Sequence, residues 1–458
     1  MTFLKMSTFI SGALLVLNPL YVQATALPGT ALTAKESAMV DWIDAHQQGA
    51  IALLEETVNI GSGTMNHDGV RAVGVVMARE LDKLGLSSRW IEMPPEINRA
   101  GHLFASKPGK SKKLLLIGHL DTVFEADDAF QAFTREGNIG RGPGIADMKD
   151  GNTVIVYALK ALQSIGALDD IAVTVAYTGD EEKTGRPLSV SRKDLIDAGK
   201  WADITLGFEG GITSEGTDWA TIARRSSSSW MLEVSGKQAH SSGVFSPSVG
   251  AGAINEAARI LNAFYDEVKG DYGLTFNAGT IQGGTAVTYD SGQNRGTTFG
   301  KTNVVPNQAI VHGGIRALSV EQLASAKQKM QSVVAQHLPQ TSASIRFVDS
   351  YPPMPPSAGN RQLAQKLSAV NEALGRGTMQ IWDPLKRGAA DISFVAPYTD
   401  ALAGLGALGK GGHTPNESLE LDSMALAIKR AAILIYRLTQ DEAIEDPRSG
   451  TLAPVKRD

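Results

Sequence analysis

The chain has 458 residues, of which 43% are hydrophobic and 20% are charged, and its formal net charge is -5. The length exceeds what one ordinary core holds, so two domains are expected, and the composition is that of a soluble globular protein. The mild acidity, without a basic stripe, argues against nucleic acid as a main partner. The sequence contains no cysteine, which excludes a disulfide framework and a lipid-anchor cysteine.

The N-terminus, residues 1–26, has the pattern of a signal peptide. Lys5 precedes a short apolar run, and residues 24–26 (Ala-Thr-Ala) form a small-x-small cleavage site. A membrane anchor is the alternative, but it needs about twenty apolar residues, and this run is broken by Asn18 and Pro19. We therefore expect a secreted protein, periplasmic if the source is bacterial, with no membrane span.

The segment that follows has the pattern of a helix-covered sheet. Helical apolar spacing runs through residues 34–87, and short aliphatic strands are predicted at 114–118, 171–177 and 203–208. Between the first two strands, residues 151–166 have the length of a crossover helix. This alternation predicts an α/β fold with a mostly parallel sheet.

A different pattern begins near residue 225. Predicted strands and helices follow one another there in the order β-α-β-β-α-β, which is typical of a ferredoxin-like α+β unit. After a proline-rich stretch, helix and strand character resumes. We therefore expect an inserted domain at 225–350, a first domain made of 27–224 and 351–440, and a loose polar tail at 441–458.

Histidines and acids follow the predicted strands of the first domain and recur in a loop before the last helix. They are His119, Asp121, Asp147, Glu181, Glu182, Glu209 and His413. Each alone has an ordinary explanation, such as a helix cap, a solvated turn or an exposed loop histidine. The carboxyl ends of strands in an open α/β sheet converge on one crevice, however. Imidazoles and carboxylates without thiolates suit hard or borderline cations, so the set predicts a metal site.

Five short motifs carry this set in order: GHLDTVF, GPGIADMKDG, GDEEKTG, GFEG and GGHTPNE. Together they resemble the dizinc metallopeptidase family of carboxypeptidases, aminoacylases and deacylases, and within it bacterial glutamate carboxypeptidase. The resemblance extends from about residue 40 to 440 and includes the inserted domain. It implies that this domain is a dimerisation lid.

The resemblance also implies a ligand set for two zinc ions per chain. Asp147 would lie between the ions. Glu182 and His413 would hold one ion, and His119 and Glu209 would hold the other.

The same resemblance implies roles for the neighbours of these ligands. Glu181 would be the general base, and Asp121 would orient the ring of His119. A cis peptide is expected after Asp147. Asp150 stands where the family usually has glycine, and we expect it to face solvent at the start of the helix.

Substrate recognition is expected from the inserted domain. Alone, His240 would be an exposed histidine and Arg316 a surface ion pair. The resemblance instead implies that His240, Asn303 and Arg316 contact the tetrahedral intermediate and the free carboxylate of the substrate, with His240 reaching the active site of the partner subunit. It also makes Glu209 typical of carboxypeptidases and acylases. The loop 386–393 (KRGAADIS), with Gly388, is expected to touch the substrate as well.

These observations favour a zinc-dependent carboxypeptidase that removes a C-terminal amino acid, glutamate among the candidates, from a peptide or an N-acyl amino acid. An aminoacylase or dipeptidase of the same family is the alternative. A non-catalytic binding protein is the remote alternative, and the presence of Glu181 beside a full ligand set argues against it. A homodimer formed through the lid is expected. No motif in the sequence specifies the side chain that is released.

Overall fold

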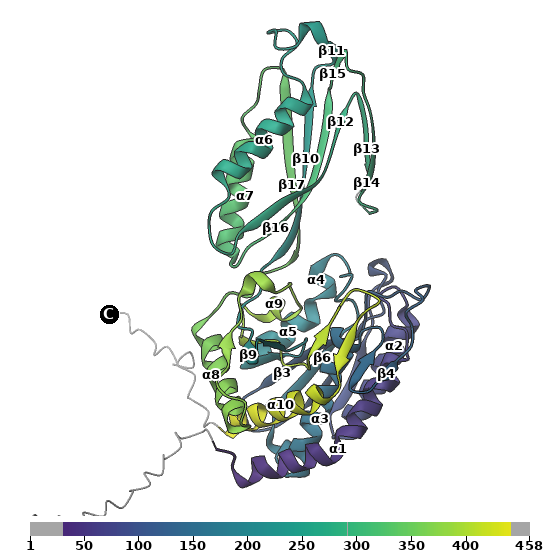
Figure 1. The fold of residues 1–458 in the computed structure, drawn as a ribbon, viewed down its shortest axis with the longest axis vertical. Helices are drawn as coiled ribbons and strands as arrows, with labels where there is room; N and C mark the ends of the chain where they lie inside the picture. Colours follow the sequence, from purple (N-terminus) through teal and green to yellow (C-terminus); the bar gives the residue numbers. More distant parts are fainter. Residues whose placement is uncertain (1–30, 291, 441–458) are drawn as a thin grey trace, which may run out of the picture.

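A computed structural model of the protein describes residues 31–290 and 292–440, so the expected signal peptide (1–26) and polar tail (441–458) lie outside the described residues. None of the helices in the described part is long and apolar enough to cross a membrane. Two units are stacked along the long axis of the molecule (Figure 1). A helix-covered sheet forms the lower unit, and a second sheet with two helices forms the upper one.

The lower unit is built on a six-stranded sheet. Its strands are, in spatial order, β1 (Ser87–Ile91), β2 (His102–Lys107), β6 (Val173–Thr178), β3 (Leu114–His119), β7 (Ile204–Gly207) and β19 (Asp400–Leu402). The four strands from β6 to β19 are parallel, which confirms the predicted α/β fold with a mostly parallel sheet. The antiparallel edge formed by β1 and β2 was not predicted, because β1 is partly exposed and has no continuous apolar run.

Helices cover both faces of this sheet. One face carries α1 (Ala34–Val58), α2 (His67–Asp82), α3 (Asp150–Ser164), α8 (Ala358–Ala373) and α10 (Asp422–Gln440), and the other carries α4 (Leu188–Ser191), α5 (Lys193–Trp201) and α9 (Ile392–Val395).

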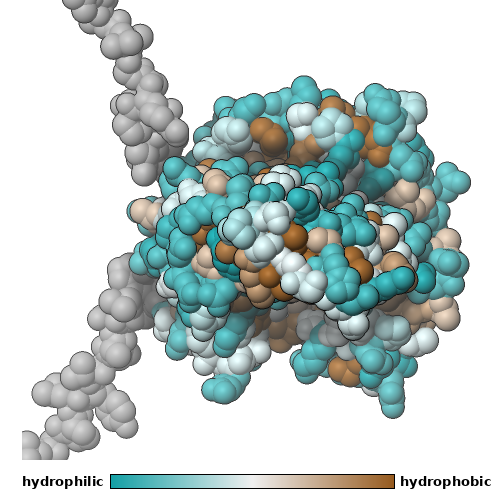
Figure 2. All heavy atoms as spheres, turned by 90° about the horizontal axis from the view of Figure 1, so that it is seen from above, coloured by the Kyte–Doolittle hydropathy of each residue, from teal (hydrophilic) through white to brown (hydrophobic). Residues whose placement is uncertain are grey.

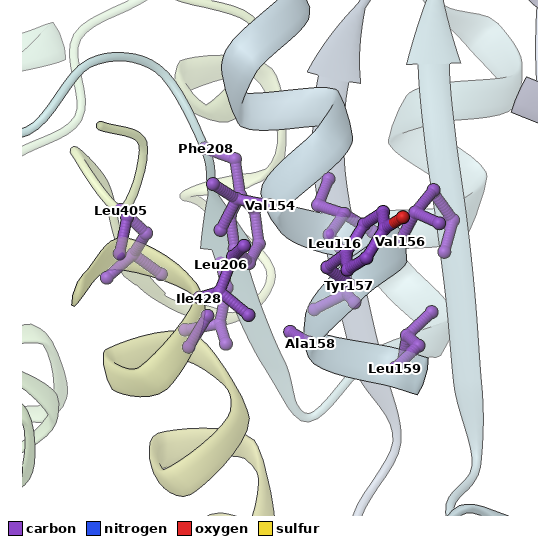
Figure 3. Packing of buried hydrophobic residues seen from close by; sticks show 14 of the residues in the cluster. Leu116, Val154, Val156, Tyr157, Ala158, Leu159, Leu206, Phe208, Leu405 and Ile428 are labelled. Carbon is purple, nitrogen blue, oxygen red and sulfur yellow. The ribbon is translucent and has the colours of Figure 1, made fainter. Parts of the chain in front are cut away.

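Strand β3 shows why both faces are covered. Leu114 and Leu116 belong to the core beneath α3 and α10, whereas Leu115 and Ile117 belong to the core beneath α5 and α9. Alternate residues of a strand point to opposite faces, so a run of aliphatic residues requires cover on both sides. Figure 3 shows the first of these cores, with Leu116 packed among side chains of α3.

The upper unit, here called the inserted unit, has a four-stranded antiparallel sheet. Its strands are, in spatial order, β12 (Thr275–Gly284), β16 (Gln308–Arg316), β10 (Ser227–Gly236) and β17 (Thr341–Tyr351). Helices α6 (Ala253–Glu267) and α7 (Val320–Val334) pack on one side of it (Figure 1) and share a separate core with the strands, containing for example Trp230 and Phe264. Two further strand pairs were not predicted: the hairpin of β13 (Ala286–Asp290) and β14 (Arg295–Phe299), and the pair of β11 (Ala239–His240) and β15 (Val304–Val305).

The chain enters and leaves the inserted unit at neighbouring points. Arg224 and Met354 form an antiparallel bridge in which each N–H donates to the other's carbonyl oxygen at 2.9 Å. Seen from above, onto the inserted unit, the surface is mostly hydrophilic with separate hydrophobic spots (Figure 2).

Two small sheets border the crevice at the carboxyl ends of the parallel strands. One contains β4 (Thr134–Glu136), β5 (Ile139–Arg141), β20 (Gly409–Lys410) and β21 (Ser418–Glu420), and the other contains β8 (Ile212–Ser214), β9 (Thr217–Ala220) and β18 (Gln380–Ile381). The pairing of β21 with β5 brings the loop 411–417 beside the turn 142–147. Segments far apart in the sequence therefore meet above the sheet.

Candidate metal and catalytic site

His119 lies at the carboxyl end of β3 and is almost completely buried. Its Nδ1 is 3.0 Å from the carbonyl oxygen of Asp121, and its Nε2 is 3.2 Å from Oδ1 of Asp147. A ring that donates from Nδ1 to a carbonyl presents the Nε2 lone pair, which is the form that binds a cation. The backbone around His119 therefore aims one ring nitrogen at Asp147.

Asp121 was expected to orient the His119 ring, and its carboxylate is also engaged elsewhere. One carboxylate oxygen lies 3.4 Å from Nδ1 of His119, farther than the carbonyl oxygen of Asp121 itself. The same carboxylate accepts the backbone N–H of Glu181 at 3.0 Å and that of Glu182 at 3.1 Å, and the hydroxyl of Thr64 at 2.7 Å. Asp121 thus fixes the turn that carries the two glutamates.

Asp147 lies between the two candidate histidine ligands. Its Oδ1 faces His119, and its Oδ2 is 3.1 Å from Nε2 of His413. Burial opposes ionisation of Asp147, but hydrogen bonds from His119 and His413 and their charge hold its pKa well below the usual range. The peptide between Asp147 and Met148 is cis, as the family resemblance implies.

Glu182 completes a group of atoms that could hold a metal ion. Its Oε2 is 3.2 Å from Nε2 of His413, while its Oε1 is buried without a hydrogen-bond partner among the described residues. Ligand atoms of Asp147, Glu182 and His413 all lie within 4.8 Å of one another, and so do those of His119, Glu181 and Glu182. Hydrogen bonds to Asp147 and Glu182 raise the pKa of His413 to about 10.

This donor set fits a divalent cation. Carboxylate oxygens and imidazole nitrogens converge at distances where their lone pairs repel one another unless a proton or a cation lies between them. The buried oxygen of Glu182 lacks any donor, and an unsatisfied buried carboxylate oxygen is costly. Hard or borderline divalent ions prefer such ligands.

Glu209, expected to hold a metal with His119, belongs to neither group of atoms. It follows β7, and its Oε2 accepts a hydrogen bond of 2.5 Å from Nη2 of Arg224. Glu209 and His119 nevertheless line one narrow cavity. Glu209 and Asp147 line a second cavity of about 200 Å³.

Glu181 is held by its backbone and has a free side chain. Its carbonyl oxygen accepts a hydrogen bond of 2.6 Å from the hydroxyl of Tyr351, and its N–H donates to Asp121. Its carboxylate forms no hydrogen bond or ion pair within the described parts of the chain. Burial raises the pKa of Glu181 well above its usual value, against the opposing charge of His119.

Glu417 is a site residue that the sequence reasoning missed. Its buried carboxylate accepts the backbone N–H groups of Gly144, Ala146 and Asp147 at 3.0, 2.8 and 2.9 Å. It fixes the turn that presents Asp147. The available signal was an acid in the same short motif as His413.

Asp150 does not face solvent, so that expectation was wrong. The loop 403–409 packs over the start of α3 and buries Asp150 completely, and the N–H of Ala407 donates to its Oδ2 at 2.7 Å. Burial raises the pKa of Asp150 to about 8.

The expected substrate residues lie at both ends of the inserted unit. His240 is exposed in β11, and the N–H of the next residue, Ser241, donates to the carbonyl oxygen of Asn303, so His240 and Asn303 are close together. Figure 1 places β11 at the end of the inserted unit that is remote from the main sheet. Arg316 ends β16 beside the start of β10, at the end nearer the main sheet. The carbonyl oxygen of Gly388 accepts a hydrogen bond from Arg224.

Comparisons with known proteins place this geometry in a family. Peptidase family M20/M25/M40 matches residues 115–437. Carboxypeptidase G2 from Pseudomonas sp. (strain RS-16) is 28% identical over 427 residues, covering 91% of this chain and 96% of that protein. Succinyl-diaminopimelate desuccinylase from Rickettsia bellii is 25% identical over 252 residues, covering 53% of this chain and 61% of that protein. The crystal structure of aminopeptidase PepT from Bacillus cereus has the same fold, with a TM-score of 0.66 at 18% identity, covering 86% of this chain and 98% of that one.

The matched segment contains His119, Asp147, Glu182 and His413 and the whole inserted unit. It spans well over half of the chain. The chain therefore belongs to peptidase family M20/M25/M40.

Proposed function

We propose that this protein is a metal-dependent carboxypeptidase. It hydrolyses the amide bond before a C-terminal amino acid, glutamate among the candidates, in a peptide or an N-acyl amino acid. The observation that carries the proposal is the free carboxylate of Glu181 within 4.8 Å of His119 and Glu182. Similarity to a carboxypeptidase over nearly the whole chain supports it.

Two zinc ions per chain are the proposed cofactors. Asp147, whose two oxygens face different histidines, would contact both ions, with Glu182 and His413 on one and His119 and Glu209 on the other. Bound zinc supplies Lewis acidity, which polarises a carbonyl and activates water. Glu209 would bind through Oε1, because its Oε2 is engaged by Arg224.

In this proposal Glu181 moves the proton. Its carboxylate takes a proton from the attacking water and delivers it to the leaving nitrogen, the double role of a free carboxylate in such a site. The turn that carries it is fixed by Asp121 and Tyr351, so the base stays in place while the proton moves.

The inserted unit is proposed to bind the substrate and to form a homodimer. Arg316 pairs with the free α-carboxylate through its guanidinium fork, while His240 and Asn303 contact the tetrahedral intermediate. We call the candidate metal ligands His119, Asp147, Glu182 and His413 the metal group. His240 lies at the end of the inserted unit that is remote from the metal group of its own chain, which supports a contribution to the partner's site. Secretion, to the periplasm if the source is bacterial, is proposed from residues 1–26.

Hydrolysis of N-acyl glutamate tests the function. The purified protein should release glutamate, lose activity with a chelator and regain it with zinc. Amidating the free α-carboxylate should lower kcat/KM. The loss of transition-state stabilisation derived from that decrease should be about 2–5 kcal/mol if Arg316 forms a desolvated pair. Equal cleavage of free and amidated substrates would show that the protein is not a carboxypeptidase.

An aminoacylase or deacylase is the second candidate, favoured by the similarity to a desuccinylase. A panel that varies the acyl group separately from the released residue decides between the two. A carboxypeptidase should follow the identity of the released residue, and a deacylase should follow the acyl group.

A further inference from the structure

Arg387 lies beside the metal group, in the cavity of about 200 Å³. Asp147, Glu209 and Gly210 line this cavity together with the glycine-rich loop 409–412. Arg387 belongs to the loop between β18 and α9, on the lower unit.

The guanidinium of Arg387 uses little of its hydrogen-bonding capacity. Nη2 donates to the carbonyl oxygen of Gly210 at 3.0 Å. Nε is buried without a partner, and across residues 31–290 and 292–440 neither Nε nor Nη1 reaches an acceptor, nor does any carboxylate form an ion pair with Arg387. Burial and the nearby charge of Arg224 lower the pKa of Arg387 to about 10, still well above neutrality. The cation is therefore charged but incompletely paired.

Other buried arginines among the described residues form more hydrogen bonds than Arg387, although Nε of Arg224 and Nε of Arg225 also lack a partner. Arg192 is paired with Asp180 and Asp391, and Arg224 is paired with Glu209. Arg225 has no acid, but it donates to Thr275 and to the carbonyl oxygen of Leu385. A partly buried guanidinium without an anion is unfavourable, so the unused donors of Arg387 mark a place for one.

The acids nearest to Arg387 are already engaged. Glu209 is bonded to Arg224, and the two oxygens of Asp147 face His119 and His413. An anion for Arg387 must therefore come from outside the chain. Nη1 is cis to Cδ, so the two edges of the guanidinium that fit a carboxylate are Nε with Nη2 and Nη1 with Nη2. Nη2 has a second N–H besides the one that it donates to Gly210, so one of these edges still offers two N–H groups to the two oxygens of a carboxylate.

Building on the proposed function, we infer that Arg387 determines specificity by pairing with a second carboxylate of the substrate, distinct from the α-carboxylate that Arg316 takes. The substrates are then dicarboxylic N-acyl amino acids. The second carboxylate belongs either to the side chain of the released residue or to the acyl group, and the chemistry at Arg387 is the same for both.

Two substrate pairs test this and separate the sources. N-acetylglutamate is compared with N-acetylglutamine, and N-succinylalanine with N-succinamylalanine, so that each pair exchanges one carboxylate for an amide of the same shape. The wild type should prefer the acid in at least one pair. Arg387→Gln should lower kcat/KM for that acid at least about tenfold and change kcat/KM for its amide less than about threefold. The pair that responds identifies the source of the carboxylate.

Lys386→Gln is the matched control, because it removes an exposed charge one residue away. Lys386→Gln should leave kcat/KM unchanged for all four substrates. Arg387→Lys should recover only part of the preference, because a lysine keeps the charge but not the fork.

Binding gives a readout that does not depend on turnover. Calorimetry with zinc-loaded protein should show tighter binding of glutarate than of glutaramate, and Arg387→Gln should abolish the difference. Equal loss of activity on the acid and its amide, with equal binding of both anions by the wild type, would overturn the inference while leaving the carboxypeptidase intact. If the wild type hydrolyses none of the four substrates, the proposed function fails, and the binding experiment still decides the role of Arg387.

Discussion

Around the metal group, carboxylates are held largely by main-chain amides. Asp121 accepts two backbone N–H groups from the turn at Glu181 and Glu182, and Glu417 accepts three from the turn that presents Asp147. Charge-assisted bonds of this kind are stronger than neutral ones and fix loop geometry. The buried acids at this site therefore divide into those that shape turns and those left free to bind or to move a proton.

The pair Glu181 and Glu182 tests this division. Glu181→Gln should lower kcat by about a hundredfold or more, because it removes proton transfer, and should keep the metal content of the wild type. Glu182→Gln should lose metal, because its carboxylate lies among the candidate ligands. Metal analysis after dialysis, beside steady-state kinetics, distinguishes the two. If the two phenotypes were exchanged, the roles assigned within the pair would be reversed.

Glu417→Gln should loosen the turn at Asp147 although Glu417 is not a proposed ligand. The amide replaces one acceptor oxygen by a donor that faces backbone N–H groups, which should lower the free energy of unfolding by about 1–3 kcal/mol. Zinc affinity should fall as well, since Asp147 is less well placed.

Denaturant unfolding and metal titration measure these effects. Glu420→Gln is the control, because Glu420 forms an exposed pair with Lys410 in the same small sheet, worth about 1 kcal/mol at most. Equal effects from both variants would mean that the three hydrogen bonds from backbone amides to Glu417 contribute neither to stability nor to zinc affinity.

At the scale of elements, Asp218 joins β9 to two helices. Its nearly fully buried carboxylate meets Arg430 of α10 and Asn371 of α8, with Arg376 and the hydroxyl of Thr213 completing the cluster. Burial opposes ionisation, but these hydrogen bonds and charges lower the pKa of Asp218. The small sheet that contains β9 is thereby fastened to the helical layer of the lower unit.

Asp218→Asn should destabilise the protein in a pH-dependent way. At neutral pH the free energy of unfolding should fall by about 3 kcal/mol, which is the low end for breaking a buried ion pair. The low end is expected because one of the two arginines left without Asp218, Arg376, is partly exposed and can be solvated. A lowered folded-state pKa contributes stability above the unfolded value of about 4, and that contribution is lost as the pH falls through the folded value. The difference in free energy of unfolding between wild type and variant should therefore become smaller below about pH 4.

Denaturant unfolding across this pH range measures the difference. Asp44→Asn is the matched control, because Asp44 is exposed and pairs with Lys429, the neighbour of Arg430 on the same helix. It should cost about 1 kcal/mol at most. A pH-independent loss in Asp218→Asn would show that the ionised carboxylate is not the source of the stability.

For the whole molecule, the inserted unit presents features that suit assembly. Phe245, Ile281 and Phe299 expose 73%, 55% and 59% of their surface, and Ile281 lies on the edge strand β12. Exposed apolar side chains are suited to contact with a second chain. These features support the proposed homodimer, in which His240 would act on the partner's metal group.

Mixed dimers test this arrangement. His240→Ala and Glu181→Ala homodimers should each be nearly inactive. When the two variants are co-expressed equally, half of the dimers are mixed and each mixed dimer has one intact site, so about a quarter of wild-type activity should return. Two affinity tags establish that mixed dimers form. Activity that stays at the level of the separate variants would show that His240 does not act across a dimer.

The sequence predicted three of the four parallel strands, β3, β6 and β7, because their burial on both faces requires a continuous run of aliphatic residues, whereas β19, only three residues long, was not predicted. Strand β3 is a run of aliphatic residues because both of its faces are buried, and the polar residues after such strands meet because parallel strands share an edge. The edge strand β1 was missed because exposure breaks its apolar pattern.

Other features depend on contacts that no local pattern records. Asp150 is buried by a loop that follows it by more than two hundred residues, and Glu417 acts through backbone amides just as distant. Arg387 is notable for bonds that it does not form, which only a three-dimensional structure can reveal. Such residues become visible when each buried polar atom is matched with its partner.

The insertion of one unit within another also sets the order in which a growing chain can become active. The continuous segment from β10 to β17, with helices α6 and α7 between them, contains every residue of its own core. When synthesis has reached the end of β17, strand β19 and helix α10 of the lower unit have not yet been made. His413, which follows Asp147 by 266 residues, has not been made either. Units complete in sequence can fold during synthesis, before later segments appear. The candidate ligands can therefore come together only after residue 413 has been made, whereas every residue in the core of the inserted unit exists before that point.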